Sequence, residues 1–128
     1  MAIKRYWAIK DNTITNAYET NLRTRATGSN MGASDVLELF KIYGQKESGT
    51  SAAANELTRV LIQFPATGSG FYAEGTNSIK ADRTAGNIPA SGSVNFYLKL
   101  YNARHSQTTP QDFEIIASIL TKEFDEGV

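Results

Sequence analysis

Short runs in which apolar and polar residues alternate limit how this chain can fold more than any other feature of its sequence. The clearest run covers residues 94–103, where every second side chain from Val94 to Leu100 is apolar. Successive side chains of a β-strand point to opposite faces, so this spacing predicts a strand with one face in the core. Three similar runs predict further strands at residues 36–43, 57–64 and 112–120. The less regular stretch at residues 6–14 predicts one or two short strands, broken near residues 10–12.

The segments between these runs are rich in residues that favour turns. Gly, Asn, Ser and Thr make up a third of the chain, and no amphipathic helix pattern reaches ten residues. The longest connection, at residues 65–89, carries four Gly, and residues 78–89 within it have the composition of one helical turn. Residues 52–56 also fit a helical turn, although five residues do not hold a helix alone. We therefore predict one all-β domain over residues 1–128, built as a β-sandwich or jelly roll.

The core of such a sandwich would consist of the apolar faces of the four main runs. Phe96 and Leu98 lie on this face in one run, and Phe113 and Ile115 lie on it in another. Burying a large apolar side chain contributes about 1.5–3 kcal/mol, so these faces would supply the main stabilising term. We therefore expect all four of these side chains to be buried.

The composition argues against several classes of protein. At 128 residues and 14.0 kDa the chain is long enough for one domain with its own core. The absence of Cys excludes disulfide scaffolds, iron–sulfur sites and thiolate zinc sites. Thirteen basic and thirteen acidic residues give no net charge, which argues against a nucleic-acid partner. No apolar run approaches about 18 residues and the N-terminus lacks the apolar region of a signal peptide, so we expect no membrane partner.

The charges are separated along the chain. Most charged residues in the range 1–25 are basic, whereas most charged residues in the range 112–128 are acidic. Short biases of this kind are usually two solvated surfaces. The other interpretation is head-to-tail complementarity between neighbouring copies of the chain.

No arrangement typical of catalysis is found in the sequence. His105 is the one histidine, and neither a Gly-x-Ser-x-Gly turn nor a phosphate-binding loop nor a His-Glu-x-x-His helix is present. We therefore expect no catalytic residue, no cofactor and no metal, and we predict that the protein is not an enzyme. A glycan hydrolase, the enzyme class that stays open, would need two carboxylates about 5–10 Å apart in a cleft.

Aromatic side chains are the first candidates for a binding surface. Tyr97 and Tyr101 lie on the outward face of the run at residues 94–103, and Tyr6 and Trp7 lie near the N-terminus. Exposed aromatic rings at such positions stack on sugar rings or become buried in a protein interface. Cover from a second sheet or from the long loop is the alternative for the tyrosine pair.

Three charged residues are further candidates for an interface or a ligand. Arg59, on the polar face of the run at residues 57–64, fits a contact with phosphate or carboxylate, or a place at the rim of the sheet. Asp125 and Glu126 fit either a calcium site completed by loop carbonyls or a solvated acidic turn.

Several motifs follow one another in an order that resembles a known family. The segments KDNTITNA, GSNMG, VLELF and LTRVLIQF occur at residues 10–17, 28–32, 36–40 and 57–64. This series resembles the DNRLRE family of β-sandwich domains, which has an Asp-x-x-Ile strand, an Asn-x-Gly turn, an apolar strand and an Arg-x-Leu-[Ile/Leu]-x-Phe strand. The block at residues 88–103 and the FDEG sequence at residues 124–127 continue the order. The whole chain also resembles virion structural proteins of large tailed bacteriophages, particularly marine, T4-like ones.

The resemblance implies a jelly-roll-like sandwich that serves as a component of a virus particle. On this basis the protein is expected in the virion, at the neck, the tail or the capsid surface, in many copies and bound to other virion proteins. The resemblance carries over no catalytic residues. A carbohydrate-binding module or receptor-binding adhesin, with a glycan as ligand, is the alternative function.

The chain departs from the family at its end. In the family more strands follow the acidic turn, whereas this sequence stops at Val128. The resemblance therefore implies either that the polypeptide continues past Val128 or that a partner supplies the missing strands. An incomplete sandwich would have an unpaired edge, which proteins normally cover.

Overall fold

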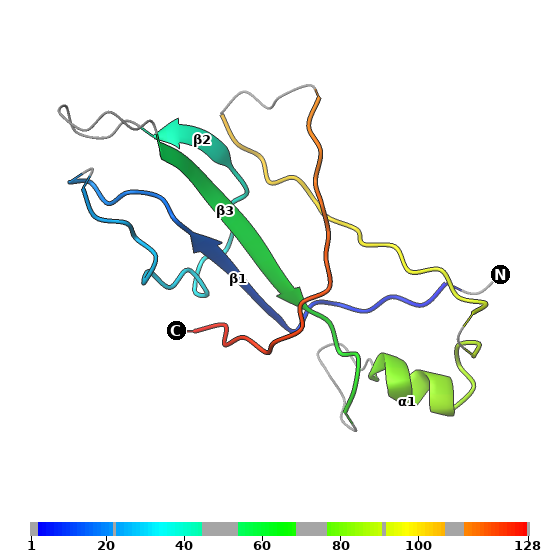
Figure 1. Ribbon diagram of the computed structural model, residues 1–128. Helices are drawn as coiled ribbons and strands as arrows, with labels where there is room; N and C mark the ends of the chain where they lie inside the picture. The colour runs from blue at the N-terminus through cyan, green and yellow to red at the C-terminus, as the bar shows by residue number, and fades with distance from the viewer. Residues whose placement is uncertain are drawn as a thin grey trace.

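A computed structural model describes residues 3–21, 23–44, 54–68, 77–90, 92–106 and 112–127. These residues form a β-rich structure with little helix (Figure 1). The strands are β1 (Lys10–Thr15), β2 (Lys41–Gly44) and β3 (Ala54–Gln63), and the short helix is α1 (Ile79–Thr84). The predicted β-rich class is therefore confirmed.

The three strands form one antiparallel sheet in the order β1-β3-β2. Thr13 pairs with Val60 in the β1–β3 ladder, and Ile42 pairs with Glu56 in the β2–β3 ladder. Backbone hydrogen bonds continue both ladders past the strand ends, from Asn16 N to Leu57 O (3.1 Å) and from Thr58 N to Phe40 O (3.0 Å). Because β3 lies in the centre, β1 and β2 are the two edge strands of this sheet.

The strand predictions are correct near the sheet and need adjustment at their ends. The break predicted near residues 10–12 is wrong, because β1 runs through these residues and pairs with β3. The run at residues 57–64 is confirmed as β3, which begins earlier, at Ala54. The helical turn predicted for residues 52–56 is therefore wrong from Ala54 onward, because these residues pair with β2, and residues 52 and 53 lie outside the described residues. In the run at residues 36–43, strand structure begins only at Lys41.

Helix α1 confirms the helical turn predicted within residues 78–89. Ser78 is its N-cap, and the Ser78 hydroxyl accepts a hydrogen bond from Ala81 N (3.1 Å) and donates one to Gly68 O (2.7 Å). Ile79 N donates to Pro65 O at 2.8 Å, which attaches the start of the helix to the residue that follows Phe64. These bonds place α1 just beyond the end of β3, as Figure 1 shows.

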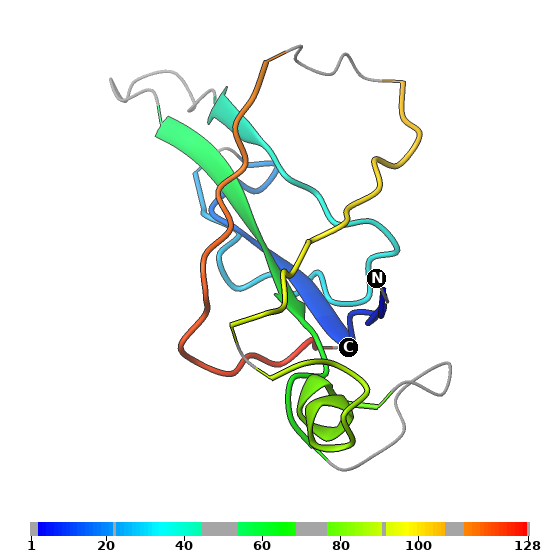
Figure 2. The ribbon, with the colours of Figure 1, turned by 90° about the vertical axis from the view of Figure 1, so that its right-hand side faces the viewer.

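The runs at residues 94–103 and 112–120, called here the first and second extended segments, differ most from the prediction. Neither contains a β-strand, and both run beside the sheet rather than within it (Figures 1 and 2). The expected burial of their apolar faces is wrong, since Phe96 is 62% and Phe113 is 63% exposed. Leu98 and Ile115 are exposed as well. The reason is that neither segment pairs with a strand or lies under a second layer of the described chain.

The interior of the described chain is mainly polar. Among the described residues, Ile88 and Pro65 are the hydrophobic side chains that are buried. The buried polar side chains are Asn12, Thr13, Glu56, Thr58, Ser78 and Asp82. The accessible surface is 10841 Å², whereas a compact protein of this mass exposes roughly 6,700 Å². This fold therefore leaves far more surface in water than a self-contained domain does.

A polar junction attaches the C-terminal segment to the start of β1. The Asn12 amide donates to Glu126 O (2.9 Å), Asp125 O (3.4 Å) and Asn30 Oδ1 (3.3 Å). Asp11 N donates to Glu126 Oε1 at 3.3 Å. The junction thus joins three segments that are far apart in sequence, and all three belong to the motifs quoted above.

The junction predicts a specific effect of Gly32→Ala. A Cβ atom at Gly32 would overlap the Glu126 carbonyl, whereas a Cβ atom at Gly28 would meet nothing within 4 Å. We expect Gly32→Ala to reduce the free energy of unfolding by about 1–3 kcal/mol, and Gly28→Ala to change it by less than about 0.5 kcal/mol. Urea denaturation followed by circular dichroism measures both variants, and equal stabilities would contradict the junction.

Candidate functional site

A buried carboxylate connects the N-terminal arm, residues 3–9, to α1. Asp82 is fully buried on the helix, and its Oδ2 atom accepts a hydrogen bond from the Tyr6 hydroxyl (2.8 Å). The same oxygen forms an ion pair with Lys4 Nζ at 2.9 Å. The other oxygen, Oδ1, accepts from the side-chain amides of Asn87 (3.0 Å) and Asn77 (3.5 Å). Both carboxylate oxygens are therefore occupied within the chain.

The arrangement shifts the pKa values of both partners in opposite directions. The hydrogen bond from Asn87 and then the contact with Lys4 hold the pKa of Asp82 well below its usual range, against the effect of burial. Burial, followed by the hydrogen bond to Asp82, raises the pKa of Tyr6 to about 12. Asp82 is thus ionised and Tyr6 is protonated at neutral pH, and the group acts as a structural latch.

The latch contains one of the aromatic residues predicted for a binding surface. Tyr6, predicted as an interface or ligand residue, uses its hydroxyl on Asp82, whereas its neighbour Trp7 is 49% exposed. Sequence reasoning missed Asp82, because a single acidic residue in a polar connection carries no motif. The signal that was available is the helical turn itself, which places Asp82 in the first turn after the Ser78 cap.

The extended segments carry the largest group of exposed apolar side chains. In the first segment this group includes Phe96, Leu98 and Leu100, which keep the alternating spacing of a strand. The group in the second segment consists of Phe113, Ile115, Ile116, Ile119 and Leu120. Exposed apolar side chains gathered in this way are typical of an interaction site. We therefore take these two segments as the candidate functional site.

The predicted tyrosine pair lies on the other face of the first segment. Tyr97 is 86% and Tyr101 is 75% exposed, so neither the long loop nor a second sheet covers them. The Lys99 ammonium lies 4.9 Å from the centre of the Tyr101 ring. A hydrogen bond from Lys99, and then its charge, lower the pKa of Tyr101. Both rings are accessible to a ligand or a partner.

The remaining charged candidates are divided between β3 and the C-terminal junction. Arg59 is an exposed residue of β3 that pairs with Ile14 across the ladder. Asp125 and Glu126 belong to the C-terminal junction, where their backbone carbonyls accept from Asn12. Among the residues that the structure describes, no group of three or more His, Cys, Asp or Glu side chains is placed to hold a metal ion.

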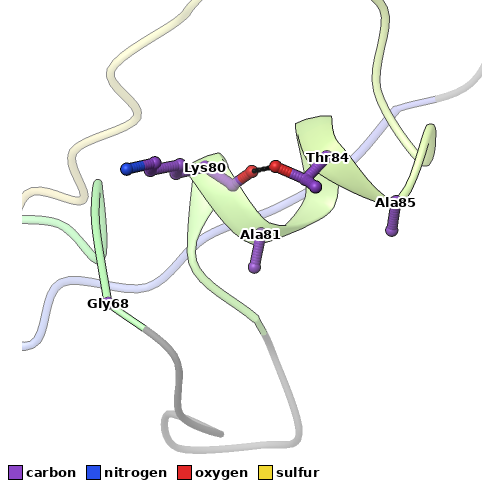
Figure 3. A pocket seen from close by; sticks show the side chains of 5 residues that line it. All are labelled: Gly68, Lys80, Ala81, Thr84 and Ala85. Carbon is purple, nitrogen blue, oxygen red and sulfur yellow. Dashed lines mark hydrogen bonds between the residues drawn. The ribbon is translucent and has the colours of Figure 1, made fainter.

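A hollow beside α1 is lined mainly by small side chains. It is lined by Gly68, Lys80, Ala81, Thr84 and Ala85, and it is open to solvent (Figure 3). The Thr84 hydroxyl donates to Lys80 O at 3.0 Å. Figure 3 shows Ala81 and Ala85 pointing to the same side, with the Lys80 side chain extending away from them. Small apolar side chains and one lysine do not form a catalytic group.

Comparisons with known proteins returned no match. No family model, no curated protein and no solved structure matches this chain. Among the described residues, no helix has the length and apolar character needed to cross a membrane.

The latch predicts stability losses at both ends of the pH range. The lowered pKa of Asp82 stabilises the folded state above the ordinary value near 3.8, and this contribution is lost as the pH falls below it. The raised pKa of Tyr6 stabilises the folded state below pH 10, and this contribution is lost as the pH rises toward about 12.

Urea denaturation at a series of pH values measures these losses. We expect Tyr6→Phe to reduce the alkaline loss and Asp82→Asn to reduce the acid loss, because each variant removes the titrating group. Alkaline and acid profiles identical to those of the unaltered chain would rule the latch out.

Proposed function

We propose that this chain is a structural component of a bacteriophage virion that acts through protein–protein assembly. The observation that carries the proposal is the exposure of the apolar faces of the two extended segments. The described part of the chain buries almost no hydrophobic side chain, so it gains little from apolar burial, the main favourable term in folding. The resemblance to virion proteins supplies the setting in which such surfaces are covered.

We further propose that the sheet is one layer of an incomplete jelly-roll-like sandwich. The two extended segments have the alternation of strands but no ladder, and β1 and β2 are edge strands. Addition of strands to an open edge supplies backbone hydrogen bonds along its whole length. On this view the sandwich is completed in the particle, at the neck, the tail or the capsid surface, by other virion proteins or by further copies.

A carbohydrate-binding module or adhesin is the second candidate. The exposure of Tyr97 and Tyr101 favours it, since accessible rings stack on the apolar faces of sugars. Binding to a glycan array that is abolished by Tyr97→Ala and retained by Trp7→Ala would support this function.

The virion proposal is tested in particles that carry the chain. Mass spectrometry of purified particles is expected to detect it in many copies, and Phe113→Asp combined with Ile115→Asp is expected to abolish its incorporation. Val36→Asp combined with Leu39→Asp makes the same change at exposed apolar side chains outside the two segments, and this matched control should be incorporated normally. Expression in infected cells without incorporation of the unaltered chain would contradict the proposal.

A further inference from the structure

The exposed surface is large enough for an extensive interface. The accessible surface of 10841 Å² exceeds that of a compact protein of the same mass by about 4,000 Å². A standard interface removes roughly 800 Å² from each partner, whereas obligate dimers remove roughly 1,000–2,500 Å². The excess therefore accommodates a large, intertwined interface.

The two extended segments complement each other in charge. Residues 94–104 carry Lys99 and Arg104 without an acidic residue, whereas residues 112–120 carry Asp112 and Glu114 without a basic one. Each segment also carries one apolar stripe. The two segments are therefore opposite in charge and alike in apolar character.

Two antiparallel registers satisfy both properties, with Lys99 opposite either Glu114 or Asp112, and the one with Glu114 pairs the longer part of the two segments. Placing Lys99 opposite Glu114 also places Leu98 opposite Ile115 and Leu100 opposite Phe113. Directly opposite residues of an antiparallel pair lie on the same face, so the apolar stripes coincide and the charges face each other. A shift by one residue would place each apolar stripe against the polar face of its partner segment.

The structure does not make this pairing within one chain. The two segments cross in the view of Figure 1 but run apart in that of Figure 2, and Leu98 and Ile115 are about half exposed, at 51% and 50%. Exchange of identical elements between copies is a low-cost route to dimers, because the same contacts are made in either arrangement.

We infer that the occupant of this surface is a second copy of the chain, whose second extended segment pairs with the first segment in the register that joins Lys99 to Glu114. The inference rests on the proposed assembly function and names the partner. Each copy donates one segment and receives one, so every contact is made twice in a reciprocal dimer.

The chain has no Cys, so engineered thiols report this pairing without background. Opposite Cα atoms in antiparallel strands lie about 4.5–5.5 Å apart, within the range that a disulfide bridges. Oxidising a mixture of the separate variants Leu98→Cys and Ile115→Cys is expected to give a disulfide-linked dimer. Replacing Ile115→Cys by Ile116→Cys moves the thiol to the opposite face and is expected to abolish the cross-link.

The variant that carries both Leu98→Cys and Ile115→Cys distinguishes the two arrangements. Exchange between copies gives linked dimers of twice 14.0 kDa, whereas pairing within the chain gives an internally closed monomer. A closed monomer, or a failure of the separate variants to cross-link, would overturn the inference. Neither result bears on incorporation into particles, so the virion proposal can stand or fall independently.

Charge reversal provides a second measurement that does not depend on the thiols. Lys99→Glu and Glu114→Lys each place like charges opposite one another twice per dimer, so each should weaken self-association in sedimentation by about tenfold. Mixing the two variants restores opposite charges only between copies, and we expect it to restore the dimer.

The control for this measurement uses charges far from the register. Lys80→Glu on α1 and Glu19→Lys change the net charge by the same amounts and should leave self-association unchanged, alone or mixed. Equal effects of the control pair and the register pair would overturn the inference, as would a monomeric unaltered chain at tens of micromolar.

Discussion

The removal of apolar surface from water is the requirement on which this structure depends. A three-stranded sheet in the order β1-β3-β2 has two faces and two edges to cover, and the described chain provides no second layer for them. The strongest apolar stripes lie instead in the two extended segments, where Phe96 and Phe113 are mostly exposed. In the assembly proposed above, contacts that these segments make with other chains supply the stability that a domain ordinarily obtains from its own core.

Polar contacts hold the chain in the arrangement that leaves these segments free. The latch around Asp82 fixes the N-terminal arm to α1, and the junction around Asn12 fixes the C-terminal segment to β1. Both contacts are specific in direction, and both join parts of the chain that are far apart in sequence. Hydrogen bonds of this kind contribute only about 0.5–1.5 kcal/mol each. They determine where the segments run, but they do not replace a hydrophobic core.

The parts of the fold that follow from local pattern were predictable. Alternation identified β3 and the end of the run that becomes β2, and the composition of residues 78–89 identified the helical turn that contains α1. The burial of Phe96 and Leu98 was predicted incorrectly, because alternation indicates which side chains share a face but not what covers that face. The same pattern fits a strand whose apolar face is covered by a second sheet and an extended segment whose apolar face nothing in the described chain covers.

The candidate site was predictable to a similar degree. Tyr97 and Tyr101 were singled out from their outward position, with cover by a second sheet or the long loop left open, and both rings are exposed in the structure. The contact between Tyr6 and Asp82 was not predicted, because the two residues are 76 positions apart in the sequence. Long-range polar pairs depend on how the backbone is routed, and periodicity contains no information about that route.

The central place of β3 has a consequence for how the molecule opens. Both β1 and β2 hydrogen-bond to β3, and the ladders overlap at Thr58, which pairs with Thr15 on one side and whose backbone amide bonds to Phe40 O on the other. Either edge strand can detach while the other ladder stays intact, but no ladder of this sheet survives the loss of β3. In amide hydrogen exchange the edge strands form the early units of opening, and the backbone protons around Thr58 exchange with solvent last.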